Sequence, residues 1–164
     1  MITISPFTGD GKTFEQTIDS MLDDHAESVG LPFNAENVYL QATDASGELV
    51  GGLTGYSQLG WMFIQYLAVA PAGRGKGLGR EMMLRAEAIA RERGLSGIWV
   101  DTYEFQAPEF YLRLGYTEYG RLPKVGAHAS RIWLFKLLKE GTASATTAPD
   151  QPGASRQVIT TKDP

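Results

Sequence analysis

The segment "VAPAGRGKGLGREMM", residues 69–83, carries glycine at every second position from 73 to 79 and then continues into a helical pattern. Glycine gives up side-chain packing and costs backbone order, so four alternating glycines indicate a ligand that approaches the backbone closely. The amides at the start of a helix lack intrahelical partners and carry the positive end of the helix dipole. Arg74, Lys76 and Arg80 add positive charge around the same turn. The segment therefore predicts a strand–loop–helix unit that binds phosphate groups.

Two familiar nucleotide-binding patterns do not fit this segment. The dinucleotide pattern G-x-G-x-x-G fails because an arginine stands at position 80, where the third glycine would be. The P-loop pattern fails because glycine, in place of Ser or Thr, follows the lysine at position 76. A second short match, "GKT" at residues 11–13, would need glycine at position 6, where the chain has proline. A P-loop nucleotide protein that uses Lys12 therefore ranks last, and a capping role for Thr13 is the simpler interpretation.

Strand and helix signals alternate along the rest of the chain. Strands are expected at residues 1–7, 37–44, 49–58, 61–69, 97–105 and 130–138. Helices are expected at residues 14–29, 78–90 and 107–115, each followed or closed by a glycine, at 30, 94 and 115. The strand at 61–69, "WMFIQYLAV", is almost continuously apolar, as expected of a strand covered on both faces. Strands interleaved with helices in this way predict a mixed α/β fold.

The composition is that of one ordinary globular domain. The 164 residues are 43% hydrophobic and 21% charged. A net charge of −4 argues against a nucleic-acid binder, whose footprint would be basic, and favours cationic partners. The sequence has no cysteine, no signal-peptide pattern at its start, and no apolar run near the roughly 20 residues that span a bilayer. We therefore expect a soluble, cytoplasmic protein.

Residues 140–164 differ in composition from the rest of the chain. They are rich in Ala, Thr, Ser, Pro and Gly and contain no aromatic residue. Such a segment buries too little apolar surface to offset its ordering entropy. We expect one domain at residues 1–139 and a flexible C-terminal tail at residues 140–164.

The glycine loop and its surroundings resemble the GNAT family of N-acetyltransferases. "RGKGLG", residues 74–79, matches that family's R/Q-x-x-G-x-G/A motif. The family places the motif after a long apolar strand and a V-x-P turn, here "YLAVAP", and before a helix ending in "RG", here Arg93 and Gly94. A later pattern, A-x-x-x-Y-x-x-x-G-Y/F, is matched by Ala107, Tyr111, Gly115 and Tyr116. The resemblance covers about residues 36–138, with its motifs in the right order.

This resemblance implies an α/β (α+β) fold with a mixed, mostly antiparallel central sheet of about six to seven strands, flanked by helices and splayed between the two central strands. It implies acetyl-CoA as co-substrate, with its pyrophosphate on the amides of residues 74–79 and its pantetheine arm beside the strand end at residues 67–69. A backbone amide near Leu67 would polarise the thioester carbonyl. The implied cofactor-binding residues are Leu67, Ala68, Val69, Arg74, Gly75, Lys76, Gly77, Leu78, Gly79 and Arg80.

Tyr111 matches the tyrosine that, in this family, protonates the departing CoA thiolate. A phenol of pKa about 10 and an aliphatic thiol of pKa about 8.5 are nearly matched for such a transfer. The base that takes the proton of the substrate ammonium stays open among Asp101, Glu104 and His128, with a water relay to a distant carboxylate as a further alternative. Family members often carry an acidic residue within the apolar strand, where this chain has Gln65, which cannot act as a base.

The expected acceptor is a primary amine of a small molecule, because a neutral-to-acidic pocket rich in aromatic residues suits a small amine. A peptide N-terminus or a lysine side chain is the competing acceptor. A non-catalytic acetyl-CoA-binding module on the same fold is the alternative outside catalysis. The resemblance is compatible with a homodimer, and we expect no metal, nucleic-acid or membrane partner.

Overall fold

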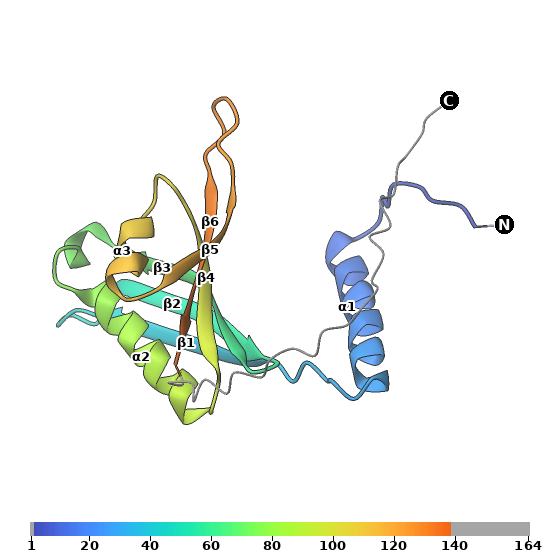
Figure 1. The fold of residues 1–164 in the computed structure, drawn as a ribbon, viewed down its shortest axis with the longest axis horizontal. Coiled ribbons are helices and arrows are strands. Elements are labelled where there is room, and N and C mark those ends of the chain that lie inside the picture. The colour runs from blue at the N-terminus through green and yellow to red at the C-terminus, as the bar shows by residue number, and fades with distance from the viewer. Residues whose placement is uncertain (1, 139–164) are drawn as a thin grey trace, which may run out of the picture.

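A computed structural model describes residues 2–138, which form a six-stranded sheet with helices (Figure 1). The helices are α1 (Gly11–Ser28), the 3-10 turn η1 (Pro71–Gly73), α2 (Leu78–Glu92) and α3 (Pro108–Arg113). The strands are β1 (Glu36–Thr43), β2 (Leu49–Gln58), β3 (Trp61–Val69), β4 (Gly97–Tyr103), β5 (Thr117–Leu122) and β6 (Arg131–Leu137).

The strand order is β1-β2-β3-β4-β6-β5, and one pair in it is parallel. β1, β2 and β3 form an antiparallel meander, because short turns can connect antiparallel neighbours directly. β4 joins β3 in parallel after the crossover through α2, and β6 and β5 continue antiparallel beyond it. This mixed, mostly antiparallel sheet flanked by helices confirms the predicted fold class.

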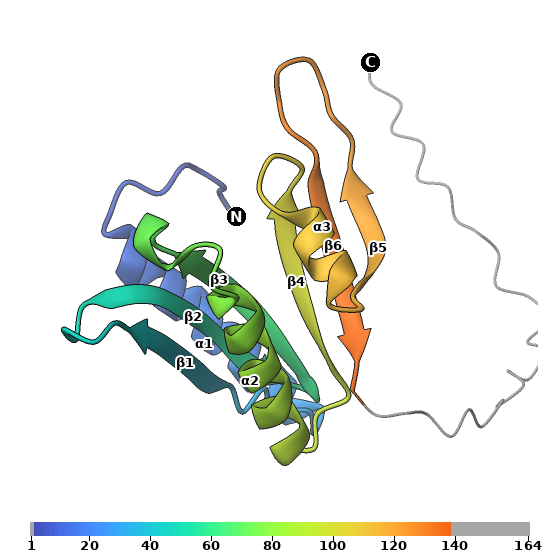
Figure 2. The same ribbon diagram turned by 90° about the vertical axis from the view of Figure 1, so that its left-hand side faces the viewer.

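The two central strands separate along their length, and the sheet opens into a V (Figure 2). β3 and β4 pair from Trp61 opposite Gly97 as far as Ile64 opposite Val100. At that level the β2–β3 ladder slips by one residue, which leaves Gln65 unmatched as a β-bulge. The bulge turns β3 away from β4, so the V opens toward the C-terminal ends of both strands.

The core lies between the sheet and α2. The helix buries a row of small and flexible apolar side chains against the strands, as an amphipathic helix does. The fully buried side chains of this core include Leu53, Met62, Met83, Ile98, Val100, Ile132 and Leu134. They come from both arms of the V, although α2 itself packs mainly on β1–β3 and more lightly on β4.

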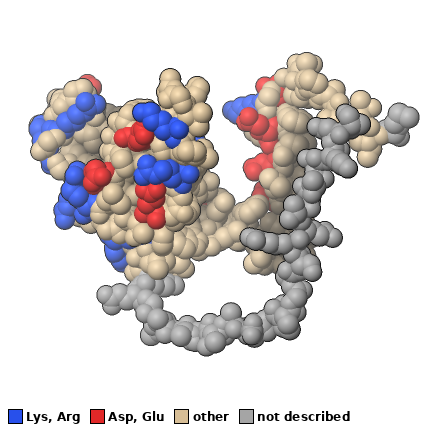
Figure 3. Space-filling model, turned by 45° about the horizontal axis from the view of Figure 1, so that its top comes forward, with Lys and Arg blue, Asp and Glu red and all other residues tan. Residues whose placement is uncertain are grey.

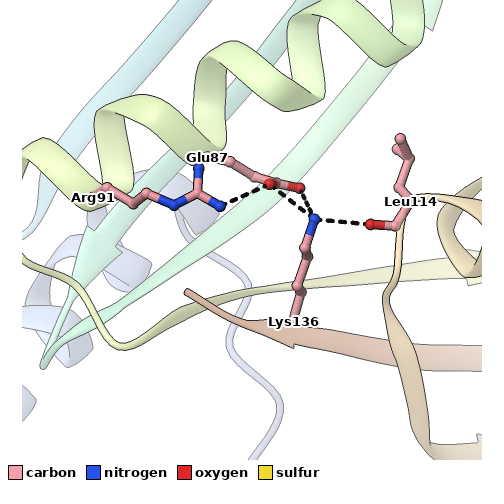
Figure 4. A network of polar contacts seen from close by, with 4 residues as sticks. All are labelled: Glu87, Arg91, Leu114 and Lys136. Carbon is pink, nitrogen blue, oxygen red and sulfur yellow. Dashed lines mark hydrogen bonds and ion pairs between the residues drawn. The ribbon is translucent and has the colours of Figure 1, made fainter. Parts of the chain in front are cut away.

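A polar contact network ties the arms together beneath the core (Figure 4). Both carboxylate oxygens of Glu87, on α2, accept hydrogen bonds from Lys136 Nζ, on β6, at 2.9 Å. Lys136 Nζ also donates to the carbonyl of Leu114 at 2.8 Å, where α3 ends. Arg91 lies 3.3 Å from the same carboxylate. The side chain of Glu87 is 2% exposed, so its charge depends on these partners.

The other face of the sheet carries no packed helix within residues 2–138. β3 buries Met62 and Ile64 on the α2 side, while the aromatic residues that alternate with them stay half-buried. The prediction that residues 61–69 are covered on both faces is therefore wrong. The run looks continuously apolar because the bulge at Gln65 shifts the alternation, so that positions 67 and 69 contact the core in place of even-numbered ones.

The structure differs from the sequence predictions at residues 2–7, at the start of α1 and at β5. Residues 2–7 form no strand, because they lie beside no free strand edge, and Ile2 and Ile4 are exposed. α1 is capped by Asp10, whose carboxylate accepts from the amide of Thr13 at 3.1 Å, so Thr13 is not the cap. β5 was not predicted, since "TEYGRL" is polar and depends on pairing with β6. The tail expected at residues 140–164 lies outside the described residues.

The predicted helix ends are confirmed: Gly30, Gly94 and Gly115 all have positive φ, as glycines that close helices do. In contrast to α2, the helix α1 stands apart from the sheet (Figure 1), and Ala26 is its buried residue. None of the helices within residues 2–138 is long and apolar enough to cross a membrane.

Candidate functional site

A cavity of about 660 Å³ lies at the open end of the V. One wall is the end of β3 with the glycine loop and the start of α2, and the other wall is α3. The lining residues are Leu67, Val69, Gly73, Arg74, Gly75, Gly77, Leu78, Gly79, Arg80, Ala107, Phe110, Arg113 and Leu114. The lining therefore includes eight of the ten residues expected to bind the cofactor, and Ala68 and Lys76 are the two outside it.

The glycines of the loop serve different purposes. Gly75 and Gly77 have φ values of 72° and 76°, a backbone region that favours glycine, and a Cβ at either position would meet open space. Gly73 is buried instead, and a Cβ there would approach the carbonyl oxygen of Val50 to 3.0 Å. Gly79 lies in the first turn of α2 opposite Phe110. The loop is thus anchored at the buried Gly73 and stays bare at Gly75 and Gly77.

The backbone of the loop presents a series of unused donors. The amides of residues 75–80 donate to no backbone carbonyl of the described chain. Gly77 caps α2 and supplies no side-chain acceptor, so the first amides of the helix keep their donors free. These N–H donors and the positive end of the helix dipole meet at the start of α2. Such an arrangement favours the binding of phosphate groups.

Three guanidinium groups lie around the same cavity. Arg74 precedes the bare part of the loop, and its Nε donates to the carbonyl of Val69 at 3.3 Å, which directs the side chain back along β3. Arg80 lies in the first turn of α2, and Arg113 comes from α3 across the cavity. Guanidinium groups bind phosphate oxygens in pairs of hydrogen bonds, so the cavity suits a polyphosphate.

The end of β3 offers an unpaired strand edge beside this anion site. Residues 67–69 pair with β2 on one side, where Leu67 lies opposite Leu53 and Val69 opposite Gly51. On the other side β4 has already diverged, since the parallel pairing ends at Ile64. An extended amide-containing ligand can hydrogen-bond to such an edge as an added strand does.

Tyr111 lies behind the cavity wall in the core. It is 8% exposed, and its ring packs edge-on against Phe110 and Tyr116, with centroids 5.0 and 5.9 Å away. Burial and, next, the negative charge of Asp101 raise the pKa of Tyr111 to about 12. The phenol is therefore protonated at neutral pH and able to donate a proton or a hydrogen bond. This pKa lies further from that of a thiol than the ordinary phenol pKa of about 10 does.

The three candidate bases lie outside the cavity lining and apart in the fold. Asp101, on β4, is ion-paired with Arg131, on β6. Glu104 follows β4 and lies 3.2 Å from Lys124. His128 is exposed and pairs through its backbone with Val125 at the tip of the β5–β6 hairpin. The structure brings the two carboxylates to the end of β4 and leaves His128 on the hairpin.

Sequence reasoning missed the second wall of the cavity. Ala107, Phe110, Arg113 and Leu114 line it. Their spacing of three or four residues places them on one face of α3, a signal that a short helix following the glycine loop could have supplied. Among the described residues, His, Asp and Glu side chains form no group of three that could hold a metal ion.

A second cavity, of about 640 Å³, separates α1 from the sheet. The helix contributes Asp19, Asp23 and Glu27, which recur every four residues and so share one helix face. The sheet side contributes Tyr56 and Gln58 from β2. Figure 3 shows acidic atoms on this helix beside the gap between it and the rest of the molecule. The cavity is polar and acidic on its helix side, so it suits a cationic ligand.

The chain is similar in sequence to several acetyltransferases. Blasticidin-S acetyltransferase of Streptomyces morookaense is 47% identical over 78 residues, which are 47% of this chain and 57% of that enzyme. An acetyltransferase of Agrobacterium fabrum is 36% identical over 100 residues, 61% of this chain and 72% of its own. Streptothricin acetyltransferase of Streptomyces lavendulae is 35% identical over 88 residues, 51% of this chain and 46% of its own. The chain thus spans only about half the length of the two antibiotic-named enzymes.

The fold is similar to those of acetyltransferases whose structures have been solved. An acetyltransferase from Bacillus cereus superposes with a TM-score of 0.71 at 27% identity, covering 81% of this chain and 97% of the other. Residues 10–116 match the model of the acetyltransferase (GNAT) family, a range that contains the glycine loop, the open strand edge and Tyr111. The chain therefore belongs to the GNAT acetyltransferase family, whose co-substrate is acetyl-CoA.

Proposed function

We propose that this protein transfers the acetyl group of acetyl-CoA to a primary amine of a small cationic molecule. The observation that carries the proposal is the run of free amides at residues 75–80, at the open end of a splayed sheet and beside an unpaired strand edge. A phosphate-binding loop and an edge for an extended amide chain, side by side, match the two ends of CoA.

In this proposal the CoA pyrophosphate lies on the amides of residues 75–80, with Arg80 and Arg113 on either side. The pantetheine arm runs along residues 67–69, which brings the thioester to the point where β3 and β4 part. A backbone amide near Leu67 then polarises the thioester carbonyl, because a donor aimed at the developing oxyanion stabilises the charge that forms there.

The reaction forms a C–N bond and breaks a C–S bond. The neutral amine attacks the thioester carbonyl carbon, and the sulfur leaves with the bonding electron pair as a thiolate. Tyr111 is the proposed general acid, since burial keeps its phenol protonated at neutral pH. With a pKa near 12 against about 8.5 for the thiol, full transfer is uphill, so the phenol stabilises the thiolate mainly as a hydrogen-bond donor.

The amine reaches the thioester as an ammonium and has to lose a proton first. Asp101 and Glu104 are the proposed acceptors of that proton, directly or through water, because both carboxylates lie where β4 ends. His128 is the weaker candidate, since it is exposed on the hairpin tip.

The acceptor class is supported by two independent features. The relatives named above include enzymes named for blasticidin-S and streptothricin. The cavity beside α1 carries Asp19, Asp23 and Glu27, which suit a molecule with positive charges in addition to the reacting amine. A peptide or protein amine is the alternative acceptor. The lack of cysteine supports a cytoplasmic location for the enzyme.

The cofactor part of the proposal is tested by calorimetry with acetyl-CoA. Gly77→Glu should abolish binding, because its carboxylate fills and repels the phosphate site. Gly47→Glu is the matched control: this glycine of the β1–β2 turn also has positive φ, 88°, and open space around it. Both variants carry the same backbone strain, so only loss confined to Gly77→Glu supports the proposal. Equal binding by both would refute the phosphate site.

Catalysis is tested by thiol release with a panel of small polyamines and aminoglycoside-like amines. Tyr111→Phe should lower kcat by about 100-fold and leave the Kd for acetyl-CoA unchanged. Tyr116→Phe is the control, since its ring packs against Tyr111 in the same core and its hydroxyl has no hydrogen-bond partner among the described residues. Tight acetyl-CoA binding without turnover of any amine would favour the non-catalytic module instead.

A further inference from the structure

Helix α1 carries an apolar stripe that residues 2–138 cover only at its first turn, where the ring of Phe7 stacks on Phe14 with centroids 4.4 Å apart. Phe14, Ile18, Met21 and Leu22 recur at spacings of three and four residues, so they share one side of the helix. They are 42%, 40%, 62% and 55% exposed. Helices in proteins take most of their stability from packing such a stripe, so this one indicates a missing partner surface.

The stripe cannot be buried on the helix's own sheet as the helix now lies. The side of α1 that faces the sheet carries Asp19, Asp23 and Glu27, which line the acidic cavity. At about 100° per residue, this acidic row lies on the side of the helix opposite Phe14, Ile18 and Met21. Leu22, at the margin of the stripe, also lines this cavity, whereas Phe14, Ile18 and Met21 point away from the helix's own sheet.

A matching apolar surface lies on the uncovered face of the sheet. Trp61, Trp99, Tyr119 and Phe135, one from each of β3, β4, β5 and β6, line a groove of about 410 Å³. The rings of Trp61 and Tyr119 each pack edge-on against Phe135, with centroids 6.3 and 5.7 Å away, so the groove is a preformed aromatic surface. We call these four residues the aromatic groove.

We propose that two copies of this chain dimerise through α1, so that the apolar stripe of each helix packs in the aromatic groove of the other copy. This proposal does not depend on the proposed function. Both complementary surfaces belong to one chain, so a twofold arrangement satisfies both at once, each contact occurring twice.

The size of the contact suits a stable dimer. A half-exposed aromatic or large aliphatic side chain still has on the order of 100 Å² to bury. The four stripe residues offer about 400 Å² in this way, but in the groove only Tyr119, at 56%, is as exposed, so the groove adds about 250 Å². One contact then buries roughly 650 Å², and symmetry doubles this to about 1,300 Å², which lies within the range of about 1,200–2,000 Å² for specific interfaces. In this arrangement the acidic row stays on the cavity side of each helix, so the dimer leaves the proposed acceptor pocket open.

Light scattering on the full chain measures the assembly. We expect twice the 17.9 kDa of one chain for the wild type, and a monomer for Ile18→Glu/Met21→Glu, which places charge in the stripe. Gln16→Glu/Ser20→Glu is the matched control, because both positions are exposed on the polar side of the same helix. It should remain a dimer. Circular dichroism of each variant verifies folding, and a monomeric wild type would overturn the proposal.

Cysteine trapping identifies the two surfaces, since the chain has no cysteine of its own. Chains with Met21→Cys are mixed with chains carrying Trp99→Cys or Tyr119→Cys and oxidised. A helix in the partner's groove gives disulfide-linked heterodimers in at least one mixture and little cross-linking of Met21→Cys alone. Dominant linkage between two Met21→Cys chains would mean that helix meets helix. Intrachain linkage in Met21→Cys/Tyr119→Cys would mean that the helix folds onto its own sheet. Either result overturns the proposal.

Discussion

Lys136→Met should destabilise the fold far more than the loss of a surface ion pair, because it leaves a buried carboxylate without its main partner. The Glu87 side chain is 2% exposed, and both of its oxygens lie 2.9 Å from Lys136 Nζ. After the substitution the carboxylate keeps only Arg91, at 3.3 Å, whose side chain is 51% exposed. Breaking a buried pair from one side costs about 3–5 kcal/mol, and the remaining guanidinium places Lys136→Met near the lower end, at about 3 kcal/mol.

A double-mutant cycle separates the ion pair from simple packing. Glu87→Leu combined with Lys136→Met removes both charges and leaves an apolar pair of similar volume, which should recover most of the loss. About 1 kcal/mol should remain, because the carbonyl of Leu114 loses the Lys136 donor. Arg91→Met, the control on the same carboxylate, should cost less than about 1 kcal/mol, since the side chain is half exposed.

Urea unfolding followed by far-UV circular dichroism gives the free energies of Lys136→Met, Glu87→Leu, the double variant and Arg91→Met, provided that the slope with urea is the same in each variant. A loss of about 3 kcal/mol is a large part of the roughly 5–15 kcal/mol that hold a domain folded. The reasoning is refuted if Lys136→Met costs no more than Arg91→Met, or if the double variant is as unstable as Lys136→Met alone.

Three further predictions follow from the site. Arg113→Ala should weaken acetyl-CoA binding about tenfold at low salt and less at high salt; a deficit that calorimetry finds independent of salt would contradict the ionic role. Gly77→Ala should lose about 1 kcal/mol of unfolding free energy because of its positive φ, whereas Gly79→Ala, within α2, should gain up to about 1 kcal/mol; urea unfolding with the same sign for both would be inconsistent. Burial raises the pKa of Tyr111 to about 12, above the unfolded value near 10, so its stabilisation is complete below pH 10 and lost between pH 10 and 12. Tyr111→Phe should therefore lessen the alkaline loss of stability by up to about 1.4 kcal/mol per pH unit, as urea unfolding at a series of pH values across this range would measure.

The parts of the fold that depend on neighbours along the chain were predictable. The bare loop, helix α2 and the hairpin of β1 and β2 follow from capping, turn and periodicity rules, which act over a few residues. For the same reason, eight of the residues that line the cavity could be predicted from one short segment, residues 67–80.

The parts of the fold that depend on pairing between distant segments could not be predicted. β5 is polar and becomes a strand only because β6 offers it an edge. The α3 wall of the cavity is made by Phe110 and Arg113; their spacing indicates only a shared helix face, and the fold brings that face opposite the glycine loop. The absence of a cover on one sheet face within residues 2–138 was hidden by the change of alternation at Gln65.

Because of the bulge at Gln65, the opening between β3 and β4 depends on the number of residues in β3. Gly55 faces it, and a Cβ there would lie 2.2 Å from the carbonyl oxygen of Phe63, so the ladder is at its tightest where the extra residue is accommodated. Exchanging one side chain of β3 for another leaves the strand the same length and the V open. Deleting Gln65 would instead restore an even alternation, turn residues 67–69 over, and let β3 stay beside β4. The unpaired edge at residues 67–69 is therefore encoded in how long the strand is, and it would be lost by a single-codon deletion that substitutions along β3 would not mimic.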